Sequence, residues 1–469
     1  MMREDAEARS IGWSELLPFL PLFRGFRMAI DVRKLVLATA AVVVLYLGGR
    51  LLDWLTPVGQ RVVVSAAGIT EPRVFVSSGL HPTAVREWIE STQKAEGATR
   101  RGVFAVLMDE WRGTLVDFTS AALSLSPRGV VNALVRALGL KLWLGVMHPI
   151  YALFFVLGVW LPVWALAGGA ICRIAALQAT RDERVSIAAA VDFSRRKFWS
   201  FVTVPLLPVG IILVIAVLLA IGGLIGAIPG FGTLVAPLLW FLAMAGGILI
   251  AIIAIGLVLA TPLMYPTIAV EGSDAYDGMS RSLSYVGQHV WRTALYYGVA
   301  MVYGSVCYVF VKLVARVGLF ATHFFVGLTM NMGSASGPAG STVPHKLNAF
   351  WQAPALDFSN PFYGALPHAS VAGVSRIGQF LISAWVYLAF AAVAGWLLSY
   401  YHSASTLAYL LLRRDEDATD LDEVWVEEDA EPAAPSQPAP APTAAPSTPG
   451  SLASLPVVGP AATTDPPLP

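Results

Sequence analysis

The sequence has few charged residues: Asp, Glu, Lys and Arg together make up 13% of its 469 positions. Soluble domains average about 25%, so this deficit excludes an ordinary water-soluble globular protein. The chain also has only two cysteines, Cys172 and Cys307, and both lie in apolar stretches without a CxxC motif. This pattern excludes a disulfide framework and a cysteine-based zinc site. We expect both cysteines to be small core residues.

Motifs for catalysis and cofactor binding are missing as well. The seven histidines form no HxxxH or HExxH pair, the spacing that zinc enzymes use. No Walker, dinucleotide-binding or GxSxG motif occurs, and GSASG at 333–337 has alanine at the position of a nucleophilic serine. We therefore expect no metal, no cofactor and no enzymatic activity.

The formal net charge of zero results from an uneven distribution of charge. All 31 Lys and Arg lie in residues 1–414, whereas 11 of the 31 Asp and Glu lie in residues 415–469. A basic body followed by an acidic tail suits contact with anionic membrane lipids. This distribution gives little support for nucleic-acid binding, and we expect no nucleic-acid partner.

Long apolar runs are what the sequence has in abundance, and its mean hydropathy is +0.65. A helix needs about 20 apolar residues to cross a bilayer. Six stretches reach this length: 35–55, 143–171, 201–227, 234–264, 293–315 and 377–400. They predict an all-α polytopic membrane protein with about six transmembrane helices.

Basic residues near the span ends predict the orientation. Most Lys and Arg of the short connections lie before the first span and after the second, fourth and sixth spans, which share one side. We therefore expect a multi-pass inner-membrane protein with both termini in the cytoplasm. Apolar residues of segment 1–34 recur at helical spacing from Trp13 to Phe26. They predict an amphipathic helix at the membrane interface, or alternatively a partner-binding helix.

The connections divide the chain further. Residues 56–141, on the outside, contain two predicted strands at 61–65 and 73–77, a polar helix over 82–97, an apolar stripe from Phe104 to Ala122, and a helix over 127–141. This region could form a small unit, but we favour packing on the membrane body. The remaining predicted segments are a repeat core at 142–316, a second outside loop at 317–375 with an interfacial or re-entrant helix near 318–330, a last span with its extension at 376–414, an acidic segment at 415–431 and a Pro/Ala-rich disordered tail at 432–469.

Two predicted cytosolic helices, near 181–199 and 273–291, resemble each other at an offset of 92 residues. This offset superposes Trp199 on Trp291, Phe193 on Tyr285 and Asp182 on Asp274. Each helix follows an inward-running span and precedes an outward-running one. The pattern predicts a parallel internal repeat about an axis along the membrane normal.

The stretches TIAVEGSDAYDGMSRSLSYVGQHVWRTALYY and SYYHSASTLAYLLLRRDEDATDLDEVW resemble an uncharacterised family of planctomycete-type bacterial polytopic membrane proteins. A fainter likeness connects them with membrane domains fused to some glycerophosphodiesterases. The resemblance covers residues 13–428. It implies the polytopic architecture and no particular activity, because the soluble phosphodiesterase barrel and its metal-binding carboxylates have no counterpart here.

Two sets of residues are candidates for a role beyond simple spanning. Asp274, Asp277 and Arg281 have the spacing of one helix face, so both carboxylates could reach one guanidinium. This charge cluster could couple the repeats or dock a partner, or it could simply keep an interfacial helix out of the lipid. Gly222 and Gly226 have the spacing of close helix packing, whereas Pro229 and Gly230 suit a turn.

Two functions remain open from the sequence. The first is a non-catalytic membrane component that organises or assists other components through its cytosolic repeat helices and acidic tail. The second is a transporter of lipid or a small solute, with a pathway between the repeats. The predicted span interiors carry almost no charge, which disfavours ion transport.

Overall fold

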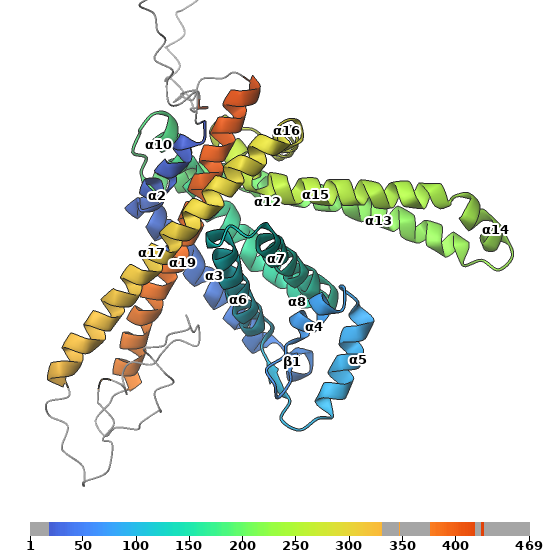
Figure 1. The fold of residues 1–469 in the computed structure, drawn as a ribbon, viewed down its shortest axis with the longest axis horizontal. Helices are drawn as coiled ribbons and strands as arrows, with labels where there is room; N and C mark the ends of the chain where they lie inside the picture. Colours follow the sequence, from blue (N-terminus) through green and yellow to red (C-terminus); the bar gives the residue numbers. More distant parts are fainter. Residues whose placement is uncertain (1–17, 331–346, 348–375, 418–423, 426–469) are drawn as a thin grey trace, which may run out of the picture. The chain divides into compact units, whose positions relative to one another are not determined.

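The computed structural model describes residues 18–330, 347, 376–417 and 424–425, and the described chain is almost entirely helical (Figure 1). Residues 1–17, 331–346, 348–375, 418–423 and 426–469 lie outside the described residues. They include most of the predicted second outside loop, most of the predicted acidic segment and the whole predicted Pro/Ala-rich tail. Two short strands, β1 (Val62–Val64) and β2 (Thr99–Arg101), pair antiparallel.

Seven helices in the described chain are long and apolar enough to cross a membrane. They are α3 (Val32–Leu55), α7 (Pro127–Met147), the unit Pro149–Thr180, α13 (Leu206–Gly226), α15 (Trp240–Glu271), α17 (Val290–Met330) and α19 (Arg376–Asp417). The polytopic all-α class is confirmed. The predicted count of six omitted α7.

The error at α7 concerns the position of the helix break. The sequence analysis ended this helix at 141 and assigned the following residues to the next predicted span, 143–171. In the structure the helix continues to Met147 and the break lies at His148. The side chain of Ser126 caps the start of α7 by accepting the N–H of Gly129. The longer helix provides a full span length at 1.5 Å per residue.

The unit Pro149–Thr180 is helical throughout but irregular. It consists of α8 (Pro149–Phe155), α9 (Leu161–Val163) and α10 (Gly169–Thr180), which two π-helical turns, Val156–Trp160 and Trp164–Gly168, connect. Pro162 lies at the start of α9 and lacks the N–H of a regular turn. Wider turns of this kind often mark functional positions in helices.

The predicted strand at 73–77 is wrong. Residues Glu71–Ser77 form a helix, α4, and the partner of β1 is β2 instead. Pro72 lies in the first turn of α4, where a missing N–H costs nothing. The carboxylate of Glu71 accepts the N–H of Val63 at 2.6 Å, so this helix start is tied to β1. The polar helix is confirmed as α5 (Pro82–Gln93).

The segment 56–141 shares its core with the spans. Val62, Phe75, Val85 and Phe104 belong to one hydrophobic cluster with Trp143 of α7 and residues of α8. At the start of α6 (Val103–Leu123), the buried Asp53 of α3 accepts the N–H groups of Phe104 and Ala105. A side chain from another helix therefore caps α6, whose own N-cap residue is Gly102.

The N-terminal described residues form short helices that pack against later parts of the chain. These are a 3-10 turn, Leu20–Phe23, and α2 (Arg24–Ala29). Met28 is buried in the largest hydrophobic cluster, and Ala29 accepts a hydrogen bond from Ser399 of α19. Among the apolar residues predicted to lie at the membrane interface, Leu20 and Phe23 are exposed, whereas Phe26 packs partly buried against the cluster that contains Trp396.

Helix α17 corrects a second prediction. Residues 318–330 continue the same helix that begins at Val290, so they form no separate interfacial or re-entrant element. A helix of 41 residues is about 60 Å long, roughly twice the hydrocarbon thickness of a bilayer. Both cysteines are buried, as predicted.

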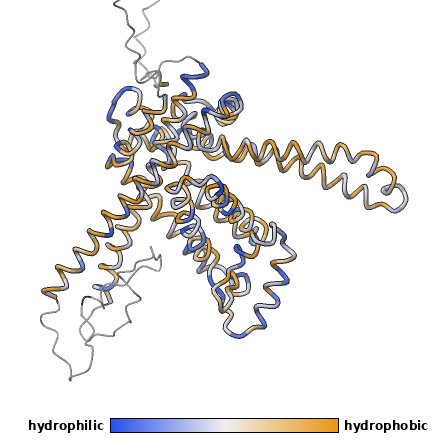
Figure 2. The backbone as a smooth tube through the Cα atoms, viewed as in Figure 1, coloured by the Kyte–Doolittle hydropathy of each residue, from blue (hydrophilic) through white to orange (hydrophobic). Residues whose placement is uncertain are grey.

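Helices α13 and α15 are the most apolar of the candidate spans, and a short helix, α14 (Phe231–Leu238), connects them. In each of these two helices, no residue of the apolar 18-residue stretch is buried inside the chain. In Figure 2 the backbone tube of this pair is mostly orange, the colour of hydrophobic residues. An apolar exposed pair of this kind requires lipid or another apolar surface around it. The predicted turn is confirmed at Gly230, whose φ is +80°.

Candidate functional site

At the C-terminal end of α15, segments that are far apart in the sequence meet. A helix leaves its last carbonyl groups without partners inside the helix. Here three other segments supply donors: Arg173 to Ala269 at 2.8 Å, the N–H of Trp425 to Val270 at 2.9 Å, and Lys197 to Gly272 at 2.5 Å. We call Ala269–Gly272 and these three residues the α15-end site.

Arg173 of α10 is the central donor of the α15-end site. It is only 7% exposed, and its second guanidinium nitrogen donates to the carbonyl of Trp425 at 2.8 Å. The guanidinium carbon lies 4.7 Å from the ring centre of Phe193 and 5.8 Å from that of Trp425. Positive charge is favourable at the negative end of a helix dipole, and the two aromatic faces add cation–π attraction.

Trp425 occupies a space that glycine keeps open. Gly272 ends α15 in the left-handed conformation with a φ of +64°, which suits glycine. A Cβ added at this position would lie 2.5 Å from the Trp425 ring. The ammonium of Lys197 lies 5.9 Å from the same ring, and Val424 is buried in the largest hydrophobic cluster. Residues 424–425, from the predicted acidic segment, are therefore held against three helices.

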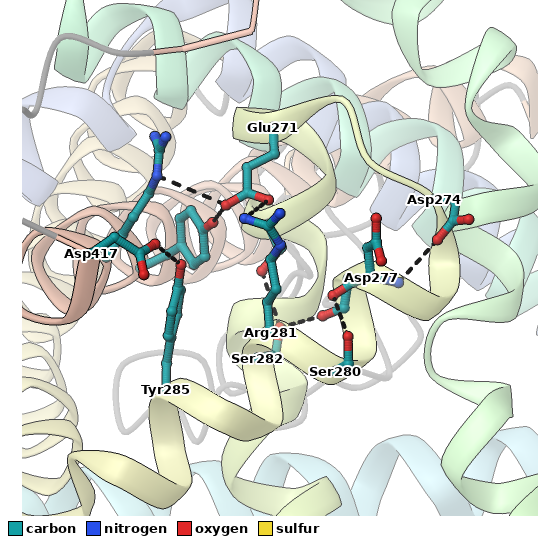
Figure 3. Close-up of polar contacts among 12 residues, drawn as sticks. Glu271, Asp274, Asp277, Ser280, Arg281, Ser282, Tyr285 and Asp417 are labelled. Carbon is teal, nitrogen blue, oxygen red and sulfur yellow. Dashed lines mark hydrogen bonds and ion pairs between the residues drawn. The ribbon is translucent and has the colours of Figure 1, made fainter. Parts of the chain in front are cut away.

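Glu271 forms the acidic half of the same helix end (Figure 3). Its side chain is 9% exposed and pairs with Arg281 of α16 (Ala275–Gln288) at 2.9 Å. Arg413 of α19 lies 3.8 Å away, and the hydroxyl of Tyr409 donates to the same carboxylate. Although burial opposes it, the charge of Glu271 raises the pKa of Arg281 above its ordinary value.

The end of α19 continues this network toward α16 and α17. Tyr285 donates to Asp417 at 2.5 Å, and Tyr296 donates to Asp415 at 2.8 Å. Burial, with a contribution from the Asp417 carboxylate, raises the pKa of Tyr285 well above its ordinary value, so its phenol remains a donor. The acidic residues at the end of α19 are thereby fixed to the second repeat helix, α16, and to α17.

The predicted cluster of Asp274, Asp277 and Arg281 forms only in part. Asp274 caps α16, and its carboxylate accepts the N–H of Asp277 at 2.9 Å. Arg281 instead directs its guanidinium to Glu271 (Figure 3). The prediction that Arg281 bridges the two aspartates is therefore wrong. The cause is that α15 ends beside α16, so a carboxylate from the preceding helix competes with those on the same helix.

A double-mutant cycle tests this reassignment. Arg281→Ala is expected to lower the free energy of unfolding by about 1 kcal/mol, a value reduced by the half-exposed guanidinium. In a Glu271→Gln background the same change should have little further effect, because the two residues act as a pair. In an Asp274→Asn/Asp277→Asn background its full effect should persist. Coupling to the aspartates instead of Glu271 would contradict the assignment.

Gly222 and Gly226 do not form the predicted helix–helix contact together. A Cβ at Gly222 would meet no heavy atom within 4 Å, and one at Gly226 would approach only Ala236 of α14, at 3.2 Å. The close approach of α13 and α15 occurs at Gly246, where an added Cβ would lie 3.0 Å from Leu219. A GxxxG spacing marks a helix face but does not identify the partner.

The sequence analysis missed a second buried polar group, at Lys34. This side chain is fully buried and donates to Gln178 at 2.9 Å and to Ser403 at 3.1 Å. Nearby on α19, the buried His402 lies 3.3 Å from the sulfur of Cys172. The available signal was the polar run SYYHSAST within an apolar helix, together with basic residues at the ends of predicted spans.

The α15-end site offers hydrogen bonds and charge but no obvious reaction chemistry. No group of three or more His, Cys, Asp or Glu side chains able to hold a metal ion occurs in the part of the chain that the structure describes. Comparison of the chain with protein-family models, curated proteins and solved structures finds no match. The arrangement is suited to holding segments together, and its basic residues and helix end suit an acidic, aromatic peptide.

Proposed function

We propose that this chain is a non-catalytic membrane protein that organises or assists other components through its cytosolic repeat helices and its acidic tail. The observation that supports this most is Trp425, which hydrogen bonds to both Val270 and Arg173. Anything bound by the acidic tail is thereby tethered to the repeat helices. A tail held at one fixed point raises the effective concentration of its partner there.

The parallel repeat is part of this proposal, and the helix boundaries support it. Helix α11 (Ile187–Arg196) is followed by α12 (Phe198–Thr203), and α16 ends at Gln288 before α17 begins at Val290. The break at Lys197 and the break at His289 are therefore 92 residues apart, the same offset as between the two repeat helices. At the same offset Phe193 and Tyr285 are buried, whereas Trp199 and Trp291 are 74% and 87% exposed.

The match is incomplete at the starts of the two helices. Asp274 caps α16, but its counterpart Asp182 has a φ of +51° and lies before Ser186, which caps α11. We therefore propose that the two repeat units share the position of their helix break and their buried face, and that they differ in the residue that caps the helix.

We further propose that both termini lie on the cytoplasmic side. The seven candidate spans include α7, which packs along α6 after a connection of only three residues. Such a hairpin enters and leaves on the same side, whether or not it crosses fully. It therefore adds an even number of crossings to the remaining six, so the termini share one side.

Cysteine labelling tests this topology. A cysteine introduced at Ile187 of α11 should resist a membrane-impermeant thiol reagent on intact spheroplasts, whereas one at Glu90 of α5 should react. After the membrane is permeabilised, both should react. Since the native Cys172 and Cys307 are buried, they serve as the background control. Reaction at 187 but not at 90 would reverse the orientation.

Two truncations test the organising role. Removal of residues 432–469 should leave abundance, thermal stability and any stoichiometric partner unchanged, because a Pro/Ala-rich segment offers no apolar face to bury. Removal of residues 418–469 also deletes Trp425 and should release the partner while the chain still accumulates. If both truncated chains still recover the same partner, the tail does not bind it and the proposed role of the tail is wrong.

The buried Lys34 supports one alternative function, a transporter with a pathway beside α3, α10 and α19. Ionisable side chains within membrane helices commonly mark transport pathways. A lipid or solute that copurifies with the wild-type chain and is lost in Lys34→Met would favour this function. A copurifying protein that is lost with residues 418–469 would favour the organising role.

A further inference from the structure

A shallow, open groove along one apolar face of α13, beginning at Thr203 of α12, is a candidate binding site that the organising role does not use. Leu206, Leu207, Gly210, Ile211, Val214 and Ile215 line it, with Thr203 at one end, and its volume is about 510 Å³. Its walls are nearly all apolar, so its occupant must be apolar where it contacts α13.

The residues that precede the groove change character in a regular order. Arg195 and Arg196 come first, both exposed and both within 3.3 Å of Asp192. The exposed Trp199 follows, and its carbonyl accepts the hydroxyl of Thr203 at the mouth of the groove. Trp199 and Thr203 share one face of α12, and Leu207 and Gly210 share one face of α13, after a turn at Val204 and Pro205.

This order of charge, aromatic ring and apolar surface corresponds to the layers of a phospholipid monolayer. Arginine pairs with lipid phosphate, tryptophan prefers the headgroup boundary, and the apolar groove suits an acyl chain. Gly210 contributes by its missing side chain, since a Cβ there would meet no heavy atom within 4 Å. We propose that this surface binds one anionic phospholipid, with its phosphate near Arg195 and Arg196 and an acyl chain along α13.

The site predicts a preference beyond that of bulk lipid. Each basic residue near a membrane surface favours an anionic headgroup by about fivefold, whereas the groove itself does not distinguish headgroups. Filling the groove and neutralising the arginines should therefore have different effects. The first should reduce lipid retention, and the second should remove only the headgroup preference.

Gly210→Leu and Gly222→Leu provide a matched pair for the test. Both positions lie on α13, and at both an added Cβ meets nothing within 4 Å, but only Gly210 lines the groove. The full chain is purified in mild detergent, incubated with equal amounts of phosphatidylglycerol and phosphatidylethanolamine, and examined by native mass spectrometry. The wild type should retain one phosphatidylglycerol molecule. Gly210→Leu should lower its retention about tenfold, and Gly222→Leu should not.

Arg195→Gln/Arg196→Gln should retain lipid without preference for phosphatidylglycerol. Val214→Phe, which fills the groove from another position, should lower lipid retention as Gly210→Leu does. If Gly210→Leu does not accumulate, Val214→Phe takes its place in the test. The proposal is overturned if the wild type retains no phospholipid, if groove-filling variants retain as much as wild type, or if Gly222→Leu loses as much. Because none of these residues contacts Trp425, failure here leaves the organising role untouched.

Discussion

Replacing Arg173 by alanine is expected to lower the free energy of unfolding by about 3–5 kcal/mol, the largest effect of any single change at the α15-end site. The change removes two hydrogen bonds from a charged donor and leaves the carbonyls of Ala269 and Trp425 without them. It also removes the cation between the rings of Phe193 and Trp425.

Two control variants separate the causes of this effect. Arg195→Ala removes an exposed guanidinium on α11 that pairs with Asp192, and it should change stability by less than about 0.5 kcal/mol. Arg173→Lys keeps the charge but loses the planar fork that reaches two carbonyls, so its effect should be intermediate. Equal stability of Arg173→Ala and Arg195→Ala in detergent would contradict the role given to Arg173.

The second large effect is expected at Gly272. Alanine there must adopt a φ of +64°, which costs about 1 kcal/mol, and its Cβ would overlap the Trp425 ring. Gly68→Ala is the control, because its φ of +74° is also positive while an added Cβ meets nothing within 4 Å. Gly272→Ala should therefore cost about 2 kcal/mol more than Gly68→Ala.

The excess at Gly272 should disappear when Trp425 is already absent. In a Trp425→Ala background, the two glycine variants should differ little in their unfolding free energy, since only the backbone strain remains. A persistent difference would assign the effect at Gly272 to the helix end itself rather than to the docked tryptophan.

The sequence predicted the helical spans well because the length and composition of an apolar run depend on the bilayer alone. It failed where the outcome depended on neighbouring segments. At 73–77 the alternating RVFVS has the pattern of a strand, but Pro72 and the bond from Val63 to Glu71 favour a helix. At α7, the predicted boundary at 141 divided a span-length helix that continues to Met147.

The candidate site was predicted only as a region. Helical spacing correctly placed Asp274, Asp277 and Arg281 on one helix, but it contained no information on Glu271 as a competing partner. Arg173 was counted among the basic residues that set orientation, although it is buried. Trp425 stood out among acidic residues, but its contacts with α10 and α15 bridge more than 150 positions of sequence, a separation that local patterns do not report.

Hydrogen exchange at the Trp425 amide tests the central claim most directly, because that N–H donates to the carbonyl of Val270 in the α15-end site. In the wild-type protein, exchange at Trp425 should be at least about 100-fold slower than at an unprotected amide, a difference of about 2.7 kcal/mol. In Arg173→Ala the protection should be lost, and in Arg195→Ala it should remain. Unprotected exchange at Trp425 in the wild type would contradict the account.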